Sequence, residues 1–341
     1  MVRLADPTHV ASEDATTPDA RKTAGAARRQ QRLWYHLGLP VPIPGRMPAP
    51  RQSLAGGEGR RVDYRKKFVV EPDSKVDLAR VDPKFTGKLS SEADAKAELD
   101  AHCERFTKLQ YLLYADGTQS LLVVLQGMDA SGKDGTVRHV FRDIDPQGIT
   151  VRSFKVPTPE ELAHDFLWRV HAAAPRRGSV AIFNRSHYED VLVARVHELV
   201  PKEVWSKRYG RIVDFEKNLV QSDTHILKFF LHISPEEQLR RFKQRLEDPA
   251  RQWKISESDY TERDYWDDYV RAYEAALEKT STERAPWFII PSDHKWFRDL
   301  VVSTIIVDTL EDLHMRLPQP HVNLADIARK YHAADAKGSL G

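Results

Sequence analysis

The sequence predicts an α/β protein built around a three-layer, parallel β-sheet. Five apolar stretches have the length of buried strands, and helix-like stretches separate them along the chain. The first of these strands, Leu121 to Leu125, runs directly into a glycine-rich turn and then into a helical stretch. Alternation of strands and helices favours a parallel sheet that carries helices on both faces.

Each element has its own local signal. Between Ser91 and Tyr114, apolar residues lie on or near one helical face, which predicts an amphipathic helix. The strands are expected where short apolar runs are bounded by polar or turn-forming residues. In chain order, the expected strands are 121–125, 150–154, 179–183, 226–233 and 287–290, and a final long helix is expected at 296–313.

Two helix starts carry a capping-box pattern. The sequence TPEE at 158–161 is expected to open a helix that continues through Val170, with proline at its first position. The sequence SPEE at 234–237 is expected to open a second helix, residues 238–246. The inner face of that helix is expected to carry Leu239, Phe242 and Leu246.

The turn after the first strand has the sequence GMDASGKDGT (127–136) and contains a GxxxxGK pattern. Between a strand and a helix, such a turn directs backbone N–H groups at a phosphate, and Lys133 adds a full positive charge. Asp129 is a carboxylate inside the turn, which favours a bound Mg²⁺. Asp134 stands where a hydroxyl residue is usual, so the metal-bound hydroxyl is expected at Thr136. The other predicted phosphate-binding residues are Gly127, Ala130, Ser131, Gly132 and Gly135.

Polar residues also follow the third predicted strand. Since parallel strands end at one edge of a sheet, these residues are expected to share a cleft with the phosphate turn. Arg185 is predicted to clamp a transferring phosphoryl group, with a structural ion pair as its alternative role. Glu189 is predicted to hold Mg²⁺ or orient a nucleotide, and the alternative is a solvated helix end. Asn184 and Tyr188 complete the predicted nucleotide-binding set.

A basic stretch between the fourth and fifth strands is predicted to form a helical lid, residues 236–268. Such a segment can close over phosphates and exclude water, although charged helices are often only solvated faces. Trp253 and Trp266 could stack on a base or pack in the core. The lid residues predicted to contact a polyanion are Arg240, Arg241, Lys243, Arg245 and Lys254.

Composition excludes several other classes of protein. The chain has one cysteine, Cys103, which rules out an internal disulfide and suits the cytoplasm. No apolar run approaches the roughly 20 residues that a membrane helix needs. The histidines show no metal-ligand spacing, and no CxxC pair or Ser/His/Asp order indicates zinc or hydrolytic chemistry. Residues 1–66 are expected to be a disordered arm, and residues 321–341 a C-terminal tail on the surface.

Several stretches together resemble the polyphosphate kinase 2 family. They are GMDASGKDGT (127–136), SFKVPTPEELAHDFLWR (153–169), FNRSHYEDVLVARVH (183–197), FFLHISPEEQLRRFKQRLEDPARQWK (229–254) and APWFIIPSDHKWFRDL (285–300). The resemblance implies a P-loop kinase fold similar to thymidylate kinase, with a lid, over residues 67–320. It also implies reversible transfer of the terminal phosphate of inorganic polyphosphate to an adenine nucleotide, with Mg²⁺ or Mn²⁺. A homo-oligomer is expected, and no nucleic-acid partner.

The resemblance also suggests residue roles. Asp129 and Glu189 would bind the metal, and Lys133 and Arg185 would contact phosphates. The sequence FNRSHYED is similar to the subgroup that phosphorylates both AMP and ADP, in which Glu189 replaces an asparagine. Many members have aspartate where this chain has Asn184, so position 184 is not expected to bind metal as a carboxylate. Two alternatives stay open at this point, an ATP-dependent nucleotide kinase and a non-catalytic polyanion-binding module.

Overall fold

The computed structural model describes residues 62–338, which form one six-stranded sheet of order β1-β6-β5-β2-β4-β3. All pairs are parallel except β1 with β6, which is antiparallel. The five predicted strands are confirmed, with ends shifted by up to two residues. The short edge strand β1 was not predicted, because two residues carry no periodicity. The strands are β1 (Val69–Val70), β2 (Ser120–Gln126), β3 (Ile149–Ser153), β4 (Val180–Asn184), β5 (Thr224–His232) and β6 (Trp287–Pro291).

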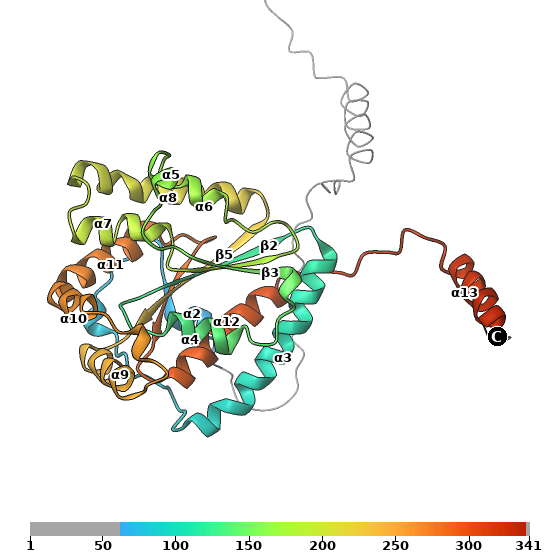
Figure 1. Cartoon of the computed structure of the whole chain (residues 1–341), viewed down its shortest axis with the longest axis horizontal. Coiled ribbons are helices and arrows are strands. Elements are labelled where there is room, and N and C mark those ends of the chain that lie inside the picture. Colours follow the sequence, from blue (N-terminus) through green and yellow to red (C-terminus); the bar gives the residue numbers. More distant parts are fainter. Residues whose placement is uncertain (1–61, 339–341) are drawn as a thin grey trace, which may run out of the picture. The chain divides into compact units, whose positions relative to one another are not determined.

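Helices cover both faces of the sheet, as the three-layer prediction requires (Figure 1). Alternate residues of β2 divide between two cores: Leu121 and Val123 face one, and Leu122 and Val124 face the other. One core is completed by α2 (Tyr64–Phe68), α3 (Glu92–Asp116), α4 (Lys133–Val140) and α12 (Lys295–Glu311). The other is completed mainly by α8 (Lys202–Gln221) and α11 (Trp266–Thr280).

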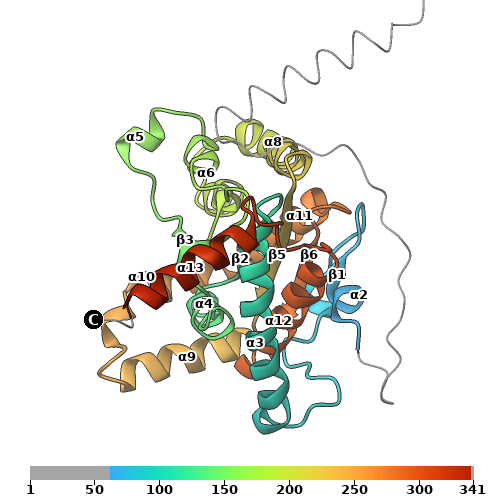
Figure 2. The same cartoon turned by 90° about the vertical axis from the view of Figure 1, so that its right-hand side faces the viewer.

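Shorter segments connect these layers and carry most of the site. The segment predicted to form a lid comprises α9 (Pro235–Glu247), α10 (Ser258–Thr261) and the 3₁₀ turns η4 (Gln252–Lys254) and η5 (Glu262–Tyr265). Helices α9 and α10 lie side by side in both views (Figures 1 and 2), and the rings of Phe242 and Tyr260 are 5.5 Å apart. The remaining elements are η1 (Leu78–Arg80), η2 (Pro146–Gly148), α5 (Pro159–Leu162), α6 (Trp168–His171), η3 (His187–Asp190), α7 (Val193–Val196) and α13 (Leu324–Gly338).

The predicted helix from Thr158 through Val170 is wrong as a single element. Its capping box is present, since Thr158 and Glu161 each bind the other's backbone N–H, but α5 ends at Leu162. The carboxylate of Asp165 then accepts a hydrogen bond from the backbone N–H of Leu167, at 3.0 Å. A local side-chain acceptor of this kind competes with the helix ladder, so a new short helix, α6, begins at Trp168.

The expectations for α9 are only partly confirmed. Ser234 caps the helix, but the reciprocal half of the capping box is missing because Glu237 binds Arg240 and Arg241 instead. Phe242 is buried as predicted, whereas Leu239 and Leu246 are exposed. The buried side of α9 includes Gln238 and Arg241, because it packs against the polar backbone of the phosphate loop.

The described residues nearest the two ends, 62–68 and 324–338, lie outside the strands of the sheet. Most of the predicted arm, residues 1–66, lies outside the described residues, but α2 begins at Tyr64 and buries that ring. In the tail, α13 exposes Leu324, Ile327 and Tyr331. Within residues 62–338, no helix combines the length and the apolar character that a membrane crossing would need.

Candidate active site

The phosphate loop, residues 127–133, joins the end of β2 to the start of α4. Gly127 and Gly132 have φ angles of 150° and 107°, and Ala130 lies in the left-handed region at 62°. The chain therefore turns sharply enough for the Lys133 ammonium to fold back over the loop. Its Nζ donates to the carbonyl oxygens of Gly127 at 2.7 Å and Met128 at 3.1 Å. Burial, together with the nearby charge of Arg185, lowers the pKa of Lys133 to about 8.

Two buried arginines support the loop from behind. Arg241 of α9 donates through Nη1 to the carbonyl oxygens of Ala130 at 2.8 Å and Ser131 at 2.9 Å. Its Nη2 donates to the backbone carbonyls of residues 292 and 293, which follow β6. Arg298 of α12 lies against Gly132 and forms an ion pair with Asp299 at 2.8 Å. Arg241 was predicted as a lid residue for the polyanion, yet it is buried and its guanidinium is occupied by the loop.

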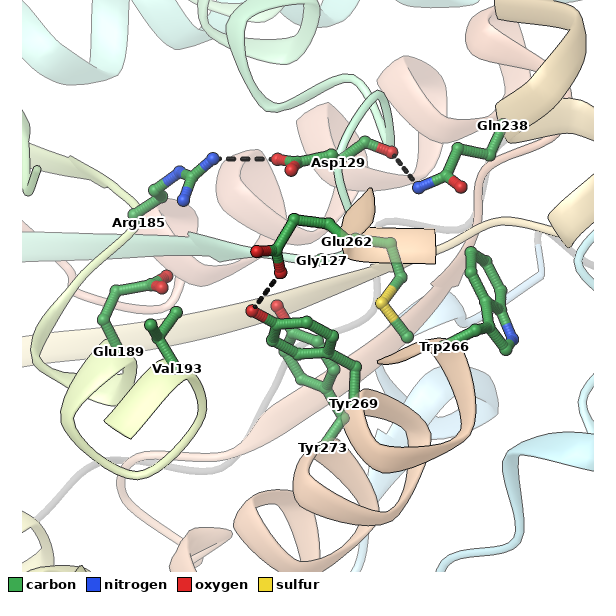
Figure 3. Close-up of a pocket in the computed structure, with 11 residues that line it drawn as sticks. Gly127, Asp129, Arg185, Glu189, Val193, Gln238, Glu262, Trp266, Tyr269 and Tyr273 are labelled. Atoms are coloured by element: carbon green, nitrogen blue, oxygen red, sulfur yellow. Dashed lines mark hydrogen bonds and ion pairs between the residues drawn. The ribbon is translucent and has the colours of Figure 1, made fainter. Parts of the chain in front are cut away.

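Arg185 follows β4 and faces the phosphate loop across the pocket. Its backbone N–H donates to Leu125 of β2 at 3.1 Å, and its φ of 60° is unusual for a residue with a Cβ. The guanidinium Nη2 donates to Asp129 Oδ1 at 2.8 Å (Figure 3). Unusual backbone conformations of this kind are often found at functional sites. Here the turn aims the arginine at the loop.

Glu189 and Asp129 line the same pocket, together with Arg185 (Figure 3). Burial raises the pKa of the Glu189 carboxyl above its usual value, although Arg185 and Lys133 oppose the rise. Oxygen ligands suit Mg²⁺, which typically retains waters and needs only one or two protein carboxylates beside substrate phosphates. No group of three or more His, Cys, Asp or Glu side chains in the described part of the chain could hold a metal. Asp129 and Glu189 have the chemistry of ligands for a metal that is shared with substrate, whereas the third carboxylate of the pocket, Glu262, accepts a hydrogen bond from Tyr269.

The sequence indicated only one residue of the other wall of the pocket, Trp266, which was expected either to stack on a base or to pack in the core. This wall comes from η5 and α11 (Figure 3). Trp266, Tyr269 and Tyr273 recur along α11 at helical spacing. Glu262 of η5 accepts a hydrogen bond from the Tyr269 hydroxyl at 2.8 Å. That aromatic spacing was visible in the sequence, but nothing local indicated that it would face the loop. The full lining is Gly127, Met128, Asp129, Arg185, Glu189, Val193, Gln238, Glu262, Trp266, Tyr269 and Tyr273.

Several other predicted site residues lie close to the loop without facing this pocket. Asp134 accepts a hydrogen bond from Asn184 Nδ2 at 2.8 Å and forms an ion pair with Lys254 at 3.2 Å. The Thr136 hydroxyl is buried and lies 3.4 Å from Asp299, to which it donates. Tyr188 is fully buried beneath the site.

The remaining cations of the predicted lid are more exposed than Arg241 and form ion pairs with nearby carboxylates. Arg240 binds Glu237 at 2.6 Å, and half of its side chain is exposed. Lys243 lies 3.7 Å from Glu247, and Arg245 lies 3.7 Å from Asp259 of α10. Surface ion pairs of this length contribute little stability. This applies to Lys243, whereas Arg240 makes two hydrogen bonds of 2.6 Å to Glu237, whose side chain is only 9% exposed, so Arg240 is held more firmly.

Several known proteins are similar to this chain in sequence and in fold. The family model of polyphosphate kinase 2 matches residues 88–318. An AMP/ADP-polyphosphate phosphotransferase of Meiothermus ruber is 53% identical over 256 residues, 75% of this chain and 96% of that protein. An ADP-polyphosphate phosphotransferase of Rhodopseudomonas palustris is 44% identical over 266 residues, 74% of this chain and 92% of that protein. The crystal structure of polyphosphate kinase 2 from Arthrobacter aurescens TC1 is 42% identical, with a TM-score of 0.73, over 79% of this chain and 98% of that one. This chain belongs to the polyphosphate kinase 2 family.

Proposed function

We propose that this protein transfers the terminal phosphate of inorganic polyphosphate to AMP or ADP, with Mg²⁺ as the divalent cation and Mn²⁺ as a substitute. One observation carries the proposal: Asp129, Arg185 and Glu189 surround a single pocket, and Lys133 lies in the loop beside it. The names of the Meiothermus and Rhodopseudomonas relatives support polyphosphate as the donor and AMP or ADP as the acceptor.

The chemistry needs positioning and charge neutralisation rather than a covalent intermediate. An oxygen of the acceptor's terminal phosphate forms a bond to the end phosphorus of the chain, and the bond to the bridging oxygen breaks. The shortened chain leaves with the electron pair of that bond. Arg185 and Lys133 would spread the charge that develops on the transferring group.

The carboxylates have a separate task. Asp129 and Glu189 would hold the cation, which supplies additional neutralisation of the phosphates when it is bound. The lid would cover the pocket and exclude water, which keeps the phosphoryl group from being hydrolysed. Its exposed cations, Arg240 and Lys243, and the partly buried Arg245 would guide the rest of the chain toward the pocket.

A product assay tests the proposal directly. Purified protein with Mg²⁺ and polyphosphate, but no ATP, is offered AMP and ADP separately. Formation of ADP from AMP and of ATP from ADP supports the proposal and the broader acceptor range. Activity with ADP alone would keep the family but contradict the interpretation of Glu189 as a mark of the subgroup that phosphorylates both AMP and ADP. Transfer from ATP alone would favour an ordinary nucleotide kinase, and binding of polyphosphate without any product would favour a non-catalytic module.

Location and assembly complete the proposal. We expect a cytoplasmic protein, because its substrates are nucleotides and its one cysteine is buried and unpaired. A homo-oligomer is expected from the family resemblance. Light scattering behind size-exclusion chromatography would test the oligomer, and a monomeric mass at working concentrations would refute it.

A further inference from the structure

A cluster of polar residues is buried below the η3 turn, which carries Glu189 and follows shortly after Arg185. Its centre is Lys228 of β5, which is 0% exposed. The Lys228 ammonium donates to Glu216 Oε2 at 2.6 Å, to the Thr280 carbonyl at 2.7 Å and to the Tyr188 hydroxyl at 3.0 Å. Each of its three N–H groups thus has an acceptor. The cluster joins β5, α8 and α11 to the η3 turn.

Helix α8 holds the η3 turn at two points. Near the start of the turn, the Tyr188 hydroxyl donates to Glu216 Oε1 at 2.8 Å. At its end, Arg208 Nη1 donates to both the carbonyl oxygen and the carboxylate of Asp190, each at 2.9 Å. Glu189 lies between these two attachments, and Arg185 is separated from the turn only by its N-cap residue, Ser186. A shift of α8 against the sheet would therefore be transmitted to both side chains.

If this cluster only stabilised the turn, apolar residues could do so at a lower desolvation cost. Removing a lysine and a glutamate from water costs more than packing apolar residues of the same size, and the replacement is often neutral or stabilising. Burial lowers the pKa of Lys228, and the Glu216 charge only partly offsets it. What the pair adds over apolar packing is direction, since hydrogen bonds fix a group's orientation and contacts between methyl groups do not.

We propose that Glu216, Lys228 and Arg208 are positioning residues for phosphoryl transfer. None of them lines the pocket; they act by fixing the η3 turn, which sets where Arg185 and Glu189 meet the transferring phosphate. The inference rests on the roles proposed above for these two side chains. Misplacing a reacting arrangement by about 1 Å can cost on the order of 100-fold in rate, so a loosened turn should affect kcat strongly.

Tyr188→Phe is the primary test, because it removes one hydroxyl and keeps the ring against Trp287, whose centroid is 4.8 Å away. We expect kcat for ADP formation to fall about 10-fold, with the KM for polyphosphate unchanged within two-fold. The matched control is Ser303→Ala, which removes an equally buried hydroxyl from α12 in the other core. The control should lower the melting temperature by a similar amount and leave kcat unchanged. An unchanged kcat in Tyr188→Phe, with a lowered melting temperature, would make the cluster purely structural and overturn the inference.

A double-mutant cycle locates the effect. If the hydroxyl acts through Glu189, then Tyr188→Phe added to Glu189→Gln should slow the enzyme no further than Glu189→Gln alone. If the hydroxyl acts through Arg185, the same non-additivity should appear with Arg185→Ala; losses that multiply independently with both variants would place the effect elsewhere and refute the inference. Full activity of both Glu189→Gln and Arg185→Ala would instead refute the proposed site itself, which is a distinguishable outcome.

A second variant keeps the test decisive if Tyr188→Phe fails to fold. Arg208→Gln alters the other attachment, where both partners remain slightly exposed, at 14% and 18% of their side chains. The same loss of kcat, with little change in KM, is expected. A folded Arg208→Gln protein with wild-type kcat would overturn the role of Arg208.

Discussion

Gly132 is the position where a single methyl group should do most damage to the phosphate loop. Its φ of 107° and ψ of 20° are favourable only for glycine. A Cβ at this position would lie 1.8 Å from Arg298 Nη1 and 2.9 Å from its Cζ. Arg298 is 1% exposed and is ion-paired with Asp299, so it has little room to retreat. Gly132→Ala would therefore create a steric clash between the phosphate loop and Arg298, the side chain that supports it.

The cost has two parts. Holding an alanine in this backbone region costs about 1–3 kcal/mol. To restore a normal contact distance the Arg298 guanidinium must move by roughly 1.5–2 Å, and disturbing a buried ion pair can cost about 3 kcal/mol or more. We expect the free energy of unfolding to fall by about 4 kcal/mol. Transfer activity should fall on the order of 100-fold even below the unfolding transition, because the Lys133 side chain starts from the displaced loop.

Urea unfolding followed by tryptophan fluorescence, with the product assay in parallel, measures both effects. Gly210→Ala is the matched control, since a Cβ there meets no heavy atom within 4 Å and the residue is in helix α8. That control should raise the free energy of unfolding by about 0.5–1 kcal/mol. If Gly132→Ala were as stable and as active as the wild type, the close packing of Arg298 on the loop would be refuted.

Three further predictions concern the charges of the site. Arg185→Lys keeps the charge but loses the planar two-point geometry, so kcat should fall by at least about 100-fold; near-normal product formation would contradict the clamp. The pKa of Lys133 is lowered from 10.5 to about 8, so kcat/KM for polyphosphate should be level below pH 8 and fall above it as the ammonium is lost. Lys133→Arg should remove that alkaline fall in whatever activity remains, and a fall that persists would assign it to another group. Raising the salt concentration should increase the KM for polyphosphate several-fold more than the KM for the nucleotide. Arg240→Gln should reduce this salt dependence. Equal salt effects on both substrates would argue against a basic path for polyphosphate.

The parallel sheet could be predicted because most of its strands contain a run of buried apolar residues, although the edge strand β3 is largely exposed. In β2, all seven residues are buried, so the run from Leu121 to Leu125 is visible without any tertiary information. The helix from Thr158 through Val170 could not be predicted correctly, since its apolar spacing continues past the point where Asp165 turns the chain. A periodic pattern records which side chains are apolar, but not whether a nearby carboxylate captures a backbone N–H.

The core of the site followed from two local facts, a phosphate-loop pattern and polar residues at strand ends. These facts indicated Asp129, Lys133 and Arg185 because the loop and the end of β4 must meet at one edge of the sheet. The aromatic wall and the buried cluster could not be reached in this way. Lys228 and Glu216 lie within strand and helix patterns that look ordinary, and only the packing of α8 on β5 turns them toward each other.

Arg241 shows most clearly why a residue's type and segment did not determine its contacts. A basic helix beside a phosphate site predicts cations that point at phosphate, yet this arginine is buried and donates to carbonyl oxygens of the loop. Asp129 shows the complementary case, because its carboxylate holds Arg185, a residue predicted to bind phosphate. Lys254 is held in the same way by Asp134. An entering phosphate chain must compete with both carboxylates for these cations, so part of its binding free energy is spent on exchanging partners. The exchange also has a benefit. Each cationic side chain is already held at the loop before the anion arrives, so it loses little conformational entropy when the anion binds.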